Sequence, residues 1–335
     1  GMENMLSGLY EQINHTTSHQ AELLKLPSKE HSFWDLMETY YQFYKLDVSH
    51  FDAVIVGKYP GWMVQHQNKI FYVAHRLRGL YDTYHYMNQP LEVPRGNAKI
   101  DQLLDYMESF PHPDSLDTFF KMVFRLKSSA GAEETPYFAF PGPLIRKLVH
   151  YMDDFAFRET QLETYYAISD TVRKRKDYFP AGSKVEVVYL PSEQGNEKTG
   201  EYRHIFVVSR LDRPKRIDLL IRAMKYVKSD IPLYIAGTGP EKDHLMKLAE
   251  KDSRIHFLGF VKDEEVDQYY ADALLVPYFP QEEDYGLITI EAMMHKKPVI
   301  TTQDAGGPTE FVSDGETGFV TACDPRAIGE KIDYM

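Results

Sequence analysis

The C-terminal part of the chain alternates between short apolar strands and amphipathic helical segments, and this order restricts the fold more than any other feature. The strand-like stretches are RHIFVVS from residue 203, PLYIAG from 232, IHFLGF from 255 and ALLVPY from 273. The helical ones are IDLLIRAMKYV from 217 and EKDHLMKLAE from 241. Strand–helix alternation with short links is typical of a parallel, doubly wound sheet. The sequence therefore predicts an α/β domain here.

The preceding part of the chain is less regular and predicts a second α/β domain that carries a helical insertion. Strands are predicted at DAVIVG from 52, KIFYVA from 69, TYYAIS from 164 and VEVVYL from 185, and a helix, DTVRKRKDYF from 170, precedes the last of them. Further helices are predicted from 3 and 33 and, within an aromatic stretch over about 79–160, from 100, 116 and 144. The polar run PSEQGNEKTGE from 191 is the expected linker. We therefore expect domains at 1–198 and 199–335.

Length and composition exclude several classes of protein. The chain has 335 residues, enough for about two domains, and a formal net charge of −12, which argues against binding to nucleic acid. No apolar run approaches the ~20 residues of a membrane-spanning helix. The single cysteine, Cys323, excludes an internal disulfide and a multi-cysteine metal site. These features predict a cytoplasmic protein and leave room for peripheral contact with the inner face of the membrane.

The first polar motif, SRLDRPKR, begins at Ser209, directly after a predicted strand and before a helix. It therefore lies at the carboxyl end of the sheet, where doubly wound folds bind ligands. Arg210 and Lys215 could converge there on a diphosphate, the guanidinium as a fork and the ammonium as a point charge. A solvated basic loop would give the same pattern.

Two further strand ends carry candidate ligand contacts. AGTGP from 236 supplies Gly237 and Gly239, and glycines after a strand allow a ligand to approach the backbone closely. A plain strand-to-helix turn has the same composition. His75 ends the strand KIFYVA and faces the crevice side of its sheet, where it could donate a hydrogen bond to a phosphate or a sugar hydroxyl. A purely structural histidine fits this position equally.

Glu283 and Glu291 flank a predicted helix start in EEDYGLITIEAM. A helix beginning at Gly286 would present the backbone N–H groups of Gly286, Leu287 and Ile288 to an anion. An acidic cap region explains Glu283 without any ligand. It explains Glu291 less well, because the apolar neighbours of Glu291 predict a mostly buried helix, in which an unpaired carboxylate is costly. A carboxylate there would suit the hydroxyl groups of a sugar.

The last motif is DAGGPTEFVSDGETGFV from 304. Its two glycines before Pro308 predict a tight turn into another helix. We interpret Glu310 and the turns at Gly315 and Gly318 as structural, with contact to a ligand as the lesser alternative. The histidines show no metal-ligand spacing, so we expect no metal site.

The chain resembles the family 4 retaining glycosyltransferases, which have the GT-B fold, in five segments. These are SRLDRPKRIDLLIRAM, IAGTGP, IHFLGFV, EDYGLITIEAM with HKKPVI, and DAGGPTEFVSDGETGFV, in that order and with the family's spacing, from about Ile205 to Pro325. More weakly, NKIFYVAHRLRGLYDTY from 68 and YAISDTVRKRKDYF from 166 resemble acceptor-domain segments of members that act on bacterial surface polysaccharides. The resemblance implies two Rossmann-like domains that face a cleft.

The resemblance also implies roles for individual residues. Glu283 falls on the position that contacts the transferred sugar, and Glu291 on the one that contacts the ribose. Phe260 and Val261 fall where the family places the nucleotide base, and His75 where a histidine contacts the donor sugar. The implied contacts of the donor diphosphate and its loops are Ser209, Arg210, Lys215, Gly237, Gly239, Gly286, Leu287 and Ile288.

The implied reaction transfers a sugar, as in a hexosyltransferase, from a UDP- or GDP-linked donor to a glycan or lipid-linked acceptor, in cell-surface polysaccharide synthesis. The resemblance implies retention of the anomeric configuration, without a metal ion or a cofactor. Arg210, Lys215 and the helix terminus would stabilise the leaving diphosphate, and a phosphate oxygen would take the proton of the acceptor hydroxyl. Closure of the two domains would exclude water.

The chain departs from the family's pattern in three places. The family's opening strand and its Gly-Gly loop have no counterpart, the chain ends at EKIDYM before the closing helices, and PYFPQEED replaces a serine-rich turn. We therefore expect an incomplete first domain. Two alternatives stay open: an inactive remnant that binds nucleotide or a partner, and a nucleotide-sugar epimerase, for which the first domain lacks acid/base residues. The base, the sugar, the acceptor and the oligomeric state do not follow from the sequence.

Overall fold

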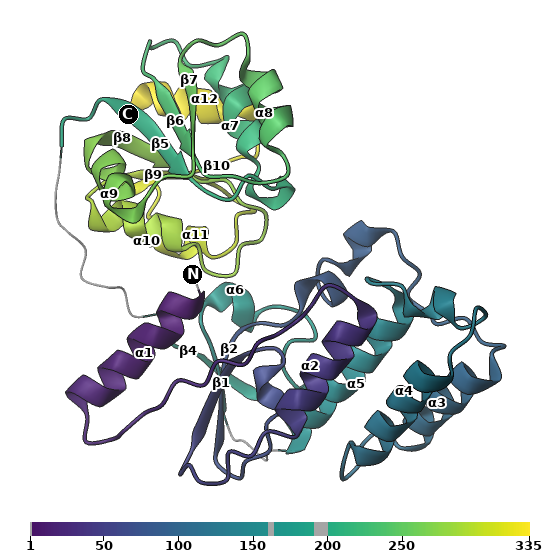
Figure 1. Ribbon diagram of the computed structural model, residues 1–335. Helices are drawn as coiled ribbons and strands as arrows, with labels where there is room; N and C mark the ends of the chain where they lie inside the picture. The colour runs from purple at the N-terminus through teal and green to yellow at the C-terminus, as the bar shows by residue number, and fades with distance from the viewer. Residues whose placement is uncertain (1, 160–163, 191–199) are drawn as a thin grey trace. The chain divides into compact units, whose positions relative to one another are not determined.

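The computed structural model describes residues 2–159, 164–190 and 200–335, and the chain divides into two compact units (Figure 1). The C-terminal unit comprises Leu190–Met335 together with Ser169–Thr171 and Gly1–Leu23. The N-terminal unit comprises Leu24–Ile168 and Val172–Tyr189. The boundary predicted between residues 198 and 199, and most of the predicted linker, lie outside the described residues.

The C-terminal unit is built on a six-stranded parallel sheet with the order β10-β9-β8-β5-β6-β7. Its strands are β5 (His204–Val208), β6 (Leu233–Ala236), β7 (Ile255–Gly259), β8 (Ala273–Pro277), β9 (Val299–Thr302) and β10 (Gly318–Thr321). The helices are α7 (Ile217–Met224), α8 (Lys242–Ala249), α9 (Asp263–Asp272), α10 (Leu287–Met294), α11 (Pro308–Phe311) and α12 (Pro325–Tyr334). The chain moves outward from β5 to β7 and then returns to β8 on the other side of β5. The predicted doubly wound sheet is thus confirmed, with its order reversing between β5 and β8.

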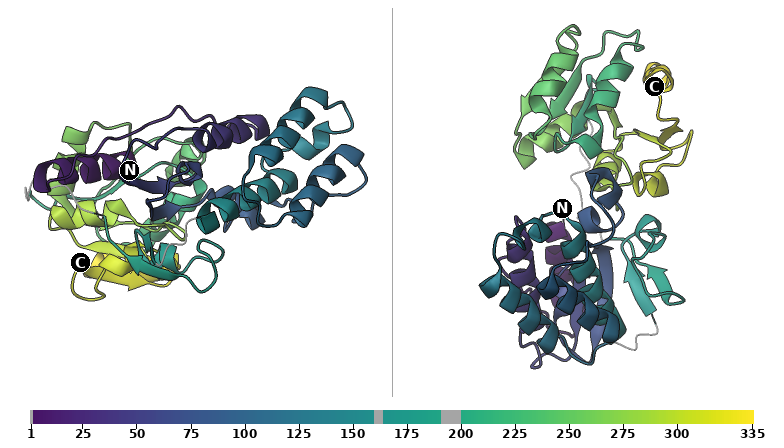
Figure 2. Two further views of the ribbon diagram at one scale, coloured as in Figure 1. Left: turned by 90° about the horizontal axis from the view of Figure 1, so that it is seen from below. Right: turned by 90° about the vertical axis from the view of Figure 1, so that its right-hand side faces the viewer.

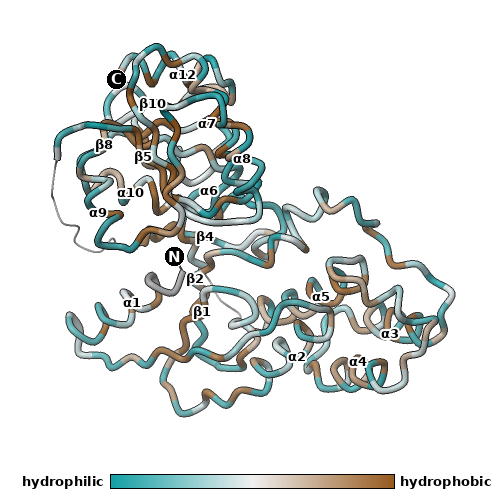
Figure 3. Tube along the Cα trace, turned by 45° about the horizontal axis from the view of Figure 1, so that its top comes forward, coloured by the Kyte–Doolittle hydropathy of each residue, from teal (hydrophilic) through white to brown (hydrophobic). Residues whose placement is uncertain are grey.

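Both faces of this sheet are buried, as a parallel sheet requires. On β5, Ile205 and Val207 join one apolar cluster, which includes Leu220 of α7 and Ile328 of α12. Phe206, between them, belongs to a second cluster on the opposite face. Figure 3 shows the hydrophobic strands at the centre of the unit. The continuous apolar runs in the sequence therefore mark strands covered on both sides.

The N-terminal unit contains a four-stranded parallel sheet in the order β1-β2-β3-β4. The strands are β1 (Val54–Lys58), β2 (Lys69–His75), β3 (Thr164–Ala167) and β4 (Lys184–Val187), each at a predicted position. The helix predicted over 170–179 is wrong in length, because α6 covers only Asp170–Arg173. Beyond it Asp177 has a φ of 62°, and the side chains of Arg175 and Tyr178 both bind Asp82. These long-range bonds end the helix after one turn.

The predicted helical insertion is also present. The long helices outside the C-terminal sheet are α1 (Met2–Thr16), α2 (Phe33–Tyr44), α3 (Ala98–Ser109), α4 (Asp117–Ser129) and α5 (Pro143–Glu159), with short 3-10 turns at Gly61–Met63, Arg78–Leu80, Tyr84–Met87 and Thr135–Phe138. Helices α3, α4 and α5 lie side by side (Figures 1 and 2). No helix in the described ranges is long and apolar enough to cross a membrane.

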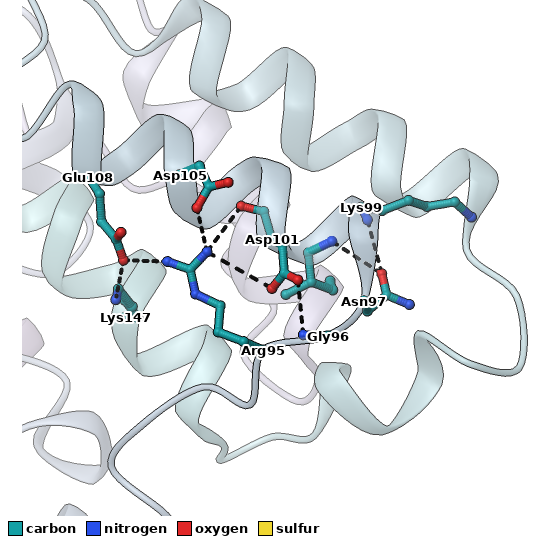
Figure 4. A network of polar contacts seen from close by, with 9 residues as sticks. Arg95, Gly96, Asn97, Lys99, Asp101, Asp105, Glu108 and Lys147 are labelled. Atoms are coloured by element: carbon teal, nitrogen blue, oxygen red, sulfur yellow. Dashed lines mark hydrogen bonds and ion pairs between the residues drawn. The ribbon is translucent and has the colours of Figure 1, made fainter.

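Charged side chains hold the insertion together at its surface. Arg95, ahead of α3, binds Asp105 and Glu108, and Lys147 of α5 reaches the same Glu108 (Figure 4). The side chain of Asn97 accepts from the backbone N–H groups of Lys99 and Ile100, which caps the first turn of α3. The acidic face of α3 is therefore largely neutralised by its own neighbours.

A buried carboxylate, Asp153 of α5, organises the core of the N-terminal unit. Its Oδ1 accepts hydrogen bonds from the Tyr40 hydroxyl at 3.0 Å and the Trp62 Nε1 at 2.7 Å. Its Oδ2 accepts from the Tyr81 hydroxyl at 2.8 Å, and the Arg76 guanidinium lies 3.8 Å away. Burial, and then the charge of Asp153, hold the pKa values of Tyr40 and Tyr81 well above their ordinary value, so both phenols remain donors.

Candidate functional site

The carboxyl ends of β5 and β8 meet at the point where the strand order reverses. In doubly wound sheets, ligands bind in the crevice outside this edge. β5 leads directly into the basic motif that contains Lys215, and β8 leads into the loop that contains Tyr278 and Glu283. Residues predicted from two distant motifs therefore come together on neighbouring strand ends.

Lys215 and Glu283 form an ion pair at this edge. The Lys215 Nζ donates to the Glu283 Oε2 at 2.6 Å and to the Tyr278 hydroxyl oxygen at 3.1 Å. The side chains of Lys215 and Glu283 are 19% and 26% exposed, whereas Tyr278 is buried. Because the two charges are partly shielded from water, their attraction is less screened than that of a surface pair. Lys215, the predicted contact of the diphosphate, and Glu283, the predicted contact of the sugar, are thus direct neighbours.

Tyr278 lies at the centre of this group and was missed in the sequence analysis. Burial raises the pKa of its phenol, and the negative charges of Glu283, Glu291 and Asp212 raise it further. Glu283 is also tied to Tyr278 by a shared partner, the Lys215 ammonium, which donates to both. The sequence does contain an indication of its role: Tyr278 directly follows an apolar strand, in the turn PYFPQEED.

Glu291 has a partner inside the protein. The Tyr270 hydroxyl, at the end of α9, donates to the Glu291 Oε2 at 3.1 Å. The protein around the carboxyl group desolvates it and raises the pKa of Glu291, although the residue as a whole is exposed, and the bond from Tyr270 opposes that rise. The expectation of a mostly buried α10 was wrong: Thr289 and Ala292 are its buried residues, and the Glu291 side chain is exposed. The helix packs on the sheet with one face, so its other apolar residues are only partly covered.

The predicted helix start at Gly286 is confirmed. α10 begins at Leu287, and Gly286 before it has a φ of 88°, in the left-handed region that favours glycine. A Cβ at Gly286 would lie 2.6 Å from the Cγ of Pro308. In the described part of the chain, no backbone group outside the helix accepts from the N–H groups of Gly286, Leu287 or Ile288. These donors can therefore face an anion.

The glycines of the DAGGP motif hold the Glu283 loop. The backbone N–H of Glu283 donates to Ala305, and the N–H of Gly307 donates back to Glu283, both at 2.8 Å. A Cβ at Gly307 would lie 2.3 Å from the carbonyl oxygen of Tyr285. Glu310 accepts three hydrogen bonds from Asp170 and Thr171, residues of the same unit. The structural interpretation of these positions agrees with the contacts.

Arg216 is a second residue that the sequence analysis missed. Its guanidinium donates to the backbone oxygens of Phe279 at 2.7 Å and Pro280 at 2.8 Å. It also forms an ion pair with Asp304, at 2.7 Å. Because these partners follow β8 and β9, Arg216 ties the loop that carries Glu283 to the loop that binds its backbone. The sequence indication was its position: Arg216 is the third cation of RPKR and directly follows Lys215.

The remaining predicted residues of this unit lie at strand ends of the same edge. Arg210 is exposed, and its Nε lies 3.5 Å from Asp212. It does not join Lys215 in a direct contact. Phe260, after β7, is 80% exposed, while Val261 packs partly against the apolar cluster of β5 and α9. An exposed ring at a sheet edge offers a free face for stacking.

Gly237 and Gly239 lie in close contact with the backbone of another loop of the protein. Gly237 has a φ of 125°, and a Cβ there would lie 1.9 Å from the carbonyl oxygen of Ser209. A Cβ at Gly239 would lie 2.2 Å from the carbonyl oxygen of Leu211. The close backbone approach that the glycines permit is therefore between the β5 and β6 loops.

Substitution of Gly237 tests whether the close contact between the two loops contributes to stability. Gly237→Ala is expected to lower the free energy of unfolding by about 1–3 kcal/mol, because strain at positive φ adds to the clash with Ser209. Gly315→Ala is the control, since Gly315 has a φ of 80° and open space around it. Urea unfolding of both variants should give the larger loss for Gly237. Equal losses would contradict a role for the close contact.

His75 belongs to the N-terminal unit, so its placement relative to the other predicted residues is not defined. It is half-buried at the end of β2, with its Nδ1 2.9 Å from the backbone oxygen of Arg76. Its ring meets Tyr59 edge to face at 5.6 Å. Within the described ranges, no group of three or more His, Cys, Asp or Glu side chains is arranged to hold a metal ion.

The C-terminal unit is similar to proteins of known function. Residues 191–335 match the family model Glycosyl transferases group 1. The poly(ribitol-phosphate) alpha-N-acetylglucosaminyltransferase of Staphylococcus aureus is 35% identical over 118 residues, 34% of this chain and 24% of that protein. The D-rhamnosyltransferase WbpZ of Pseudomonas aeruginosa is 26% identical over 210 residues, 58% of this chain and 52% of that protein.

Among solved structures, Anabaena HepE in complex with UDP and glucose is similar, with a TM-score of 0.48, 16% identity and coverage of 80% of this chain and 76% of that one. The chain spans 24% and 52% of the length of the two curated relatives. The matched residues 191–335 carry every predicted site residue except His75. Residues 191–335 of the chain are therefore similar to the glycosyl transferases group 1 family.

Proposed function

We propose that the protein is a retaining glycosyltransferase that moves a sugar from a UDP- or GDP-linked donor to a glycan or lipid-linked acceptor in cell-surface polysaccharide synthesis. One observation carries the proposal. Lys215, Tyr278 and Glu283 are joined by hydrogen bonds at the point where the strand order reverses, in a domain similar to a glycosyltransferase family. We place it in the cytoplasm, with a donor domain at 199–335 and an acceptor-side domain at 1–198.

In this proposal the donor lies along the edge of the C-terminal sheet. The Lys215 ammonium and the first N–H groups of α10 bind the diphosphate, and Arg210 closes over it from its exposed position. Glu283 accepts a hydrogen bond from a hydroxyl of the transferred sugar. Glu291, already bonded to Tyr270, accepts from the ribose. The exposed ring of Phe260 stacks on the base.

The chemistry is a displacement at the anomeric carbon. The bond from this carbon to the diphosphate oxygen breaks, and the diphosphate leaves with additional negative charge. Lys215 and the N–H groups of α10 oppose that charge as it develops, which lowers the barrier. The acceptor hydroxyl oxygen bonds to the same face of the carbon, so configuration is retained, and its proton passes to an oxygen of the leaving diphosphate.

The names of two relatives support the proposed class of acceptor. The Staphylococcus aureus relative is named for poly(ribitol-phosphate). A Campylobacter jejuni relative, 30% identical over 125 residues, is named for a diphospho-undecaprenol-linked sugar. A polymer and a lipid diphosphate are both bulky acceptors, which the proposal assigns to the N-terminal unit together with His75.

Incubation with UDP- and GDP-sugars and a lipid diphosphate-linked sugar tests the proposal. We expect release of the nucleoside diphosphate and a new glycosidic bond with the anomeric configuration of the donor, as read by NMR. A product of opposite configuration would contradict the retaining mechanism. Conversion of the donor into its epimer without glycoside formation would contradict transfer.

Glu291→Gln is expected to weaken nucleotide binding by about tenfold or more, because a hydrogen bond to a charged acceptor contributes roughly 1.5–3 kcal/mol. The rate at saturating donor should stay close to that of the wild type, because Glu291 does not touch the transferred sugar. Calorimetry and initial rates measure the two effects. Tyr270→Phe, which removes only the partner of Glu291, should give a smaller loss of affinity. A lower saturated rate with unchanged affinity would contradict the ribose assignment.

A further inference from the structure

A groove on the N-terminal unit lies outside the proposed donor site. It runs between α2 and α4 and has a volume of about 860 Å³. Tyr41 comes from α2, and Lys121, Phe124 and Arg125 come from α4. All of its lining belongs to the N-terminal unit, in the part of the chain that the helical insertion occupies.

The groove carries more positive than negative charge, because Lys45, Lys121 and Arg125 line it together with one carboxylate, Asp117. Lys121 and Arg125 are exposed and lie four residues apart on α4, where like charges repel and destabilise the helix. Within the described residues, neither has a carboxylate within ion-pair distance. The other cations of α3 and α4 are paired, Lys99 with Glu134 and Lys127 with Glu38.

The acidic side chains of the helical insertion are largely engaged by other cations. Acidic residues of α3 are held by Arg95 and Lys147 (Figure 4). Asp117, the acidic residue in the groove, forms an ion pair with Lys45 and also acts electrostatically on Lys121. The whole chain has a net charge of −12, whereas the lining of the groove carries three cations and one carboxylate. Such a surface is complementary to an anionic ligand.

Aromatic rings line the groove beside the cations. The rings of Tyr41 and Phe124 meet edge to face at 5.1 Å, and both residues are half-buried. Phe120 lies beneath them, fully covered, 5.0 Å from Tyr41. Flat apolar ring faces next to cations suit a ligand that has both apolar faces and negative charges. Saccharides offer C–H faces, and acidic ones also offer carboxylates or phosphates.

We propose that the groove between α2 and α4 binds an anionic saccharide chain, with Tyr41 and Phe124 against its sugar rings and Lys121 and Arg125 on its acidic groups. The inference that the anionic ligand is a saccharide rests on the proposed function. The groove would then hold part of an extended acidic acceptor. It contains no residue of the donor site, so binding to it can be measured without a nucleotide.

Calorimetric titration of the full chain with a hexamer of galacturonate tests the proposal, with maltohexaose as the neutral match. We expect binding of the acidic hexamer alone, and weaker binding as salt rises, because the charges are exposed. The double variant Lys121→Gln/Arg125→Gln should lose about tenfold in affinity or more. The control Lys247→Gln/Lys251→Gln removes the same charge at the same spacing elsewhere and should bind like the wild type.

Phe124→Leu separates ring contacts from charge, since it keeps both cations and most of the apolar volume. The proposal expects it to bind the acidic hexamer several-fold more weakly, with an unchanged circular dichroism spectrum. Equal affinity for both hexamers, or no loss in the double variant, would overturn the proposal. Binding to phosphatidylglycerol vesicles without binding to the hexamer would also overturn it and point to a membrane surface. Failure to bind UDP and GDP would count against the donor site and leave this test unaffected.

Discussion

Glu283→Gln is expected to lower the transfer rate by about 100-fold or more and to raise the affinity for the free nucleoside diphosphate. Glutamine keeps the shape of the side chain and loses its charge, so it binds a sugar hydroxyl less strongly as charge develops at the anomeric carbon. At the same time the Lys215 ammonium loses its ion-pair partner, which lies 2.6 Å away. Lys215 is then available to the diphosphate without competition.

The two effects are read in separate measurements. Initial rates at saturating donor give the loss of transfer, and calorimetry with UDP and GDP gives the affinity. Glu264→Gln, at an exposed position of α9, changes the net charge equally and should alter neither. A variant with wild-type transfer and weaker nucleotide binding would show that Glu283 acts on the nucleotide and would contradict its assignment to the sugar.

Asp153→Ala is expected to lower the free energy of unfolding by about 3–5 kcal/mol, as in other proteins that lose one member of a buried ion pair. The variant leaves the donors of Tyr40, Trp62 and Tyr81 without an acceptor. It also leaves the Arg76 guanidinium, which is 2% exposed, without its carboxylate. Each unsatisfied buried group adds its own desolvation cost.

Urea unfolding followed by tryptophan fluorescence measures this loss, because Trp62 reports on the same core. Asp154→Ala is the matched control: it lies next in the sequence, its side chain is exposed, and its effect should stay within about 0.5 kcal/mol. Similar stabilities for the two variants would contradict the role of Asp153 as the centre of the core.

Features set by local sequence could be predicted. The strands of both sheets follow from short apolar runs, and the start of α10 follows from Gly286, because glycine readily adopts the left-handed conformation found before this helix. The order of motifs also placed Lys215 and Glu283 at one edge of the sheet. That edge is fixed by topology alone, since parallel strands share their carboxyl ends.

Features set by contacts between distant residues could not be predicted. The helix from residue 170 ends early because Arg175 and Tyr178 turn to Asp82. The role of Tyr278 depends on Lys215, 63 positions earlier in the chain, and that of Arg216 on loops after two other strands. Exposure of Glu291 depends on which face of α10 meets the sheet, and the nearly uniform apolarity of this helix gives no indication of that face.

The central claim is that Lys215, held by Tyr278 and Glu283, forms the diphosphate site of a nucleotide-sugar enzyme. Calorimetric titration of the wild-type chain and of Lys215→Met with UDP and GDP tests it most directly. The account predicts saturable binding of one nucleotide at a single site, and a loss of about tenfold or more in the variant, as expected for a charge-assisted contact. Absence of binding to both nucleotides, or equal binding by wild type and variant, would contradict it.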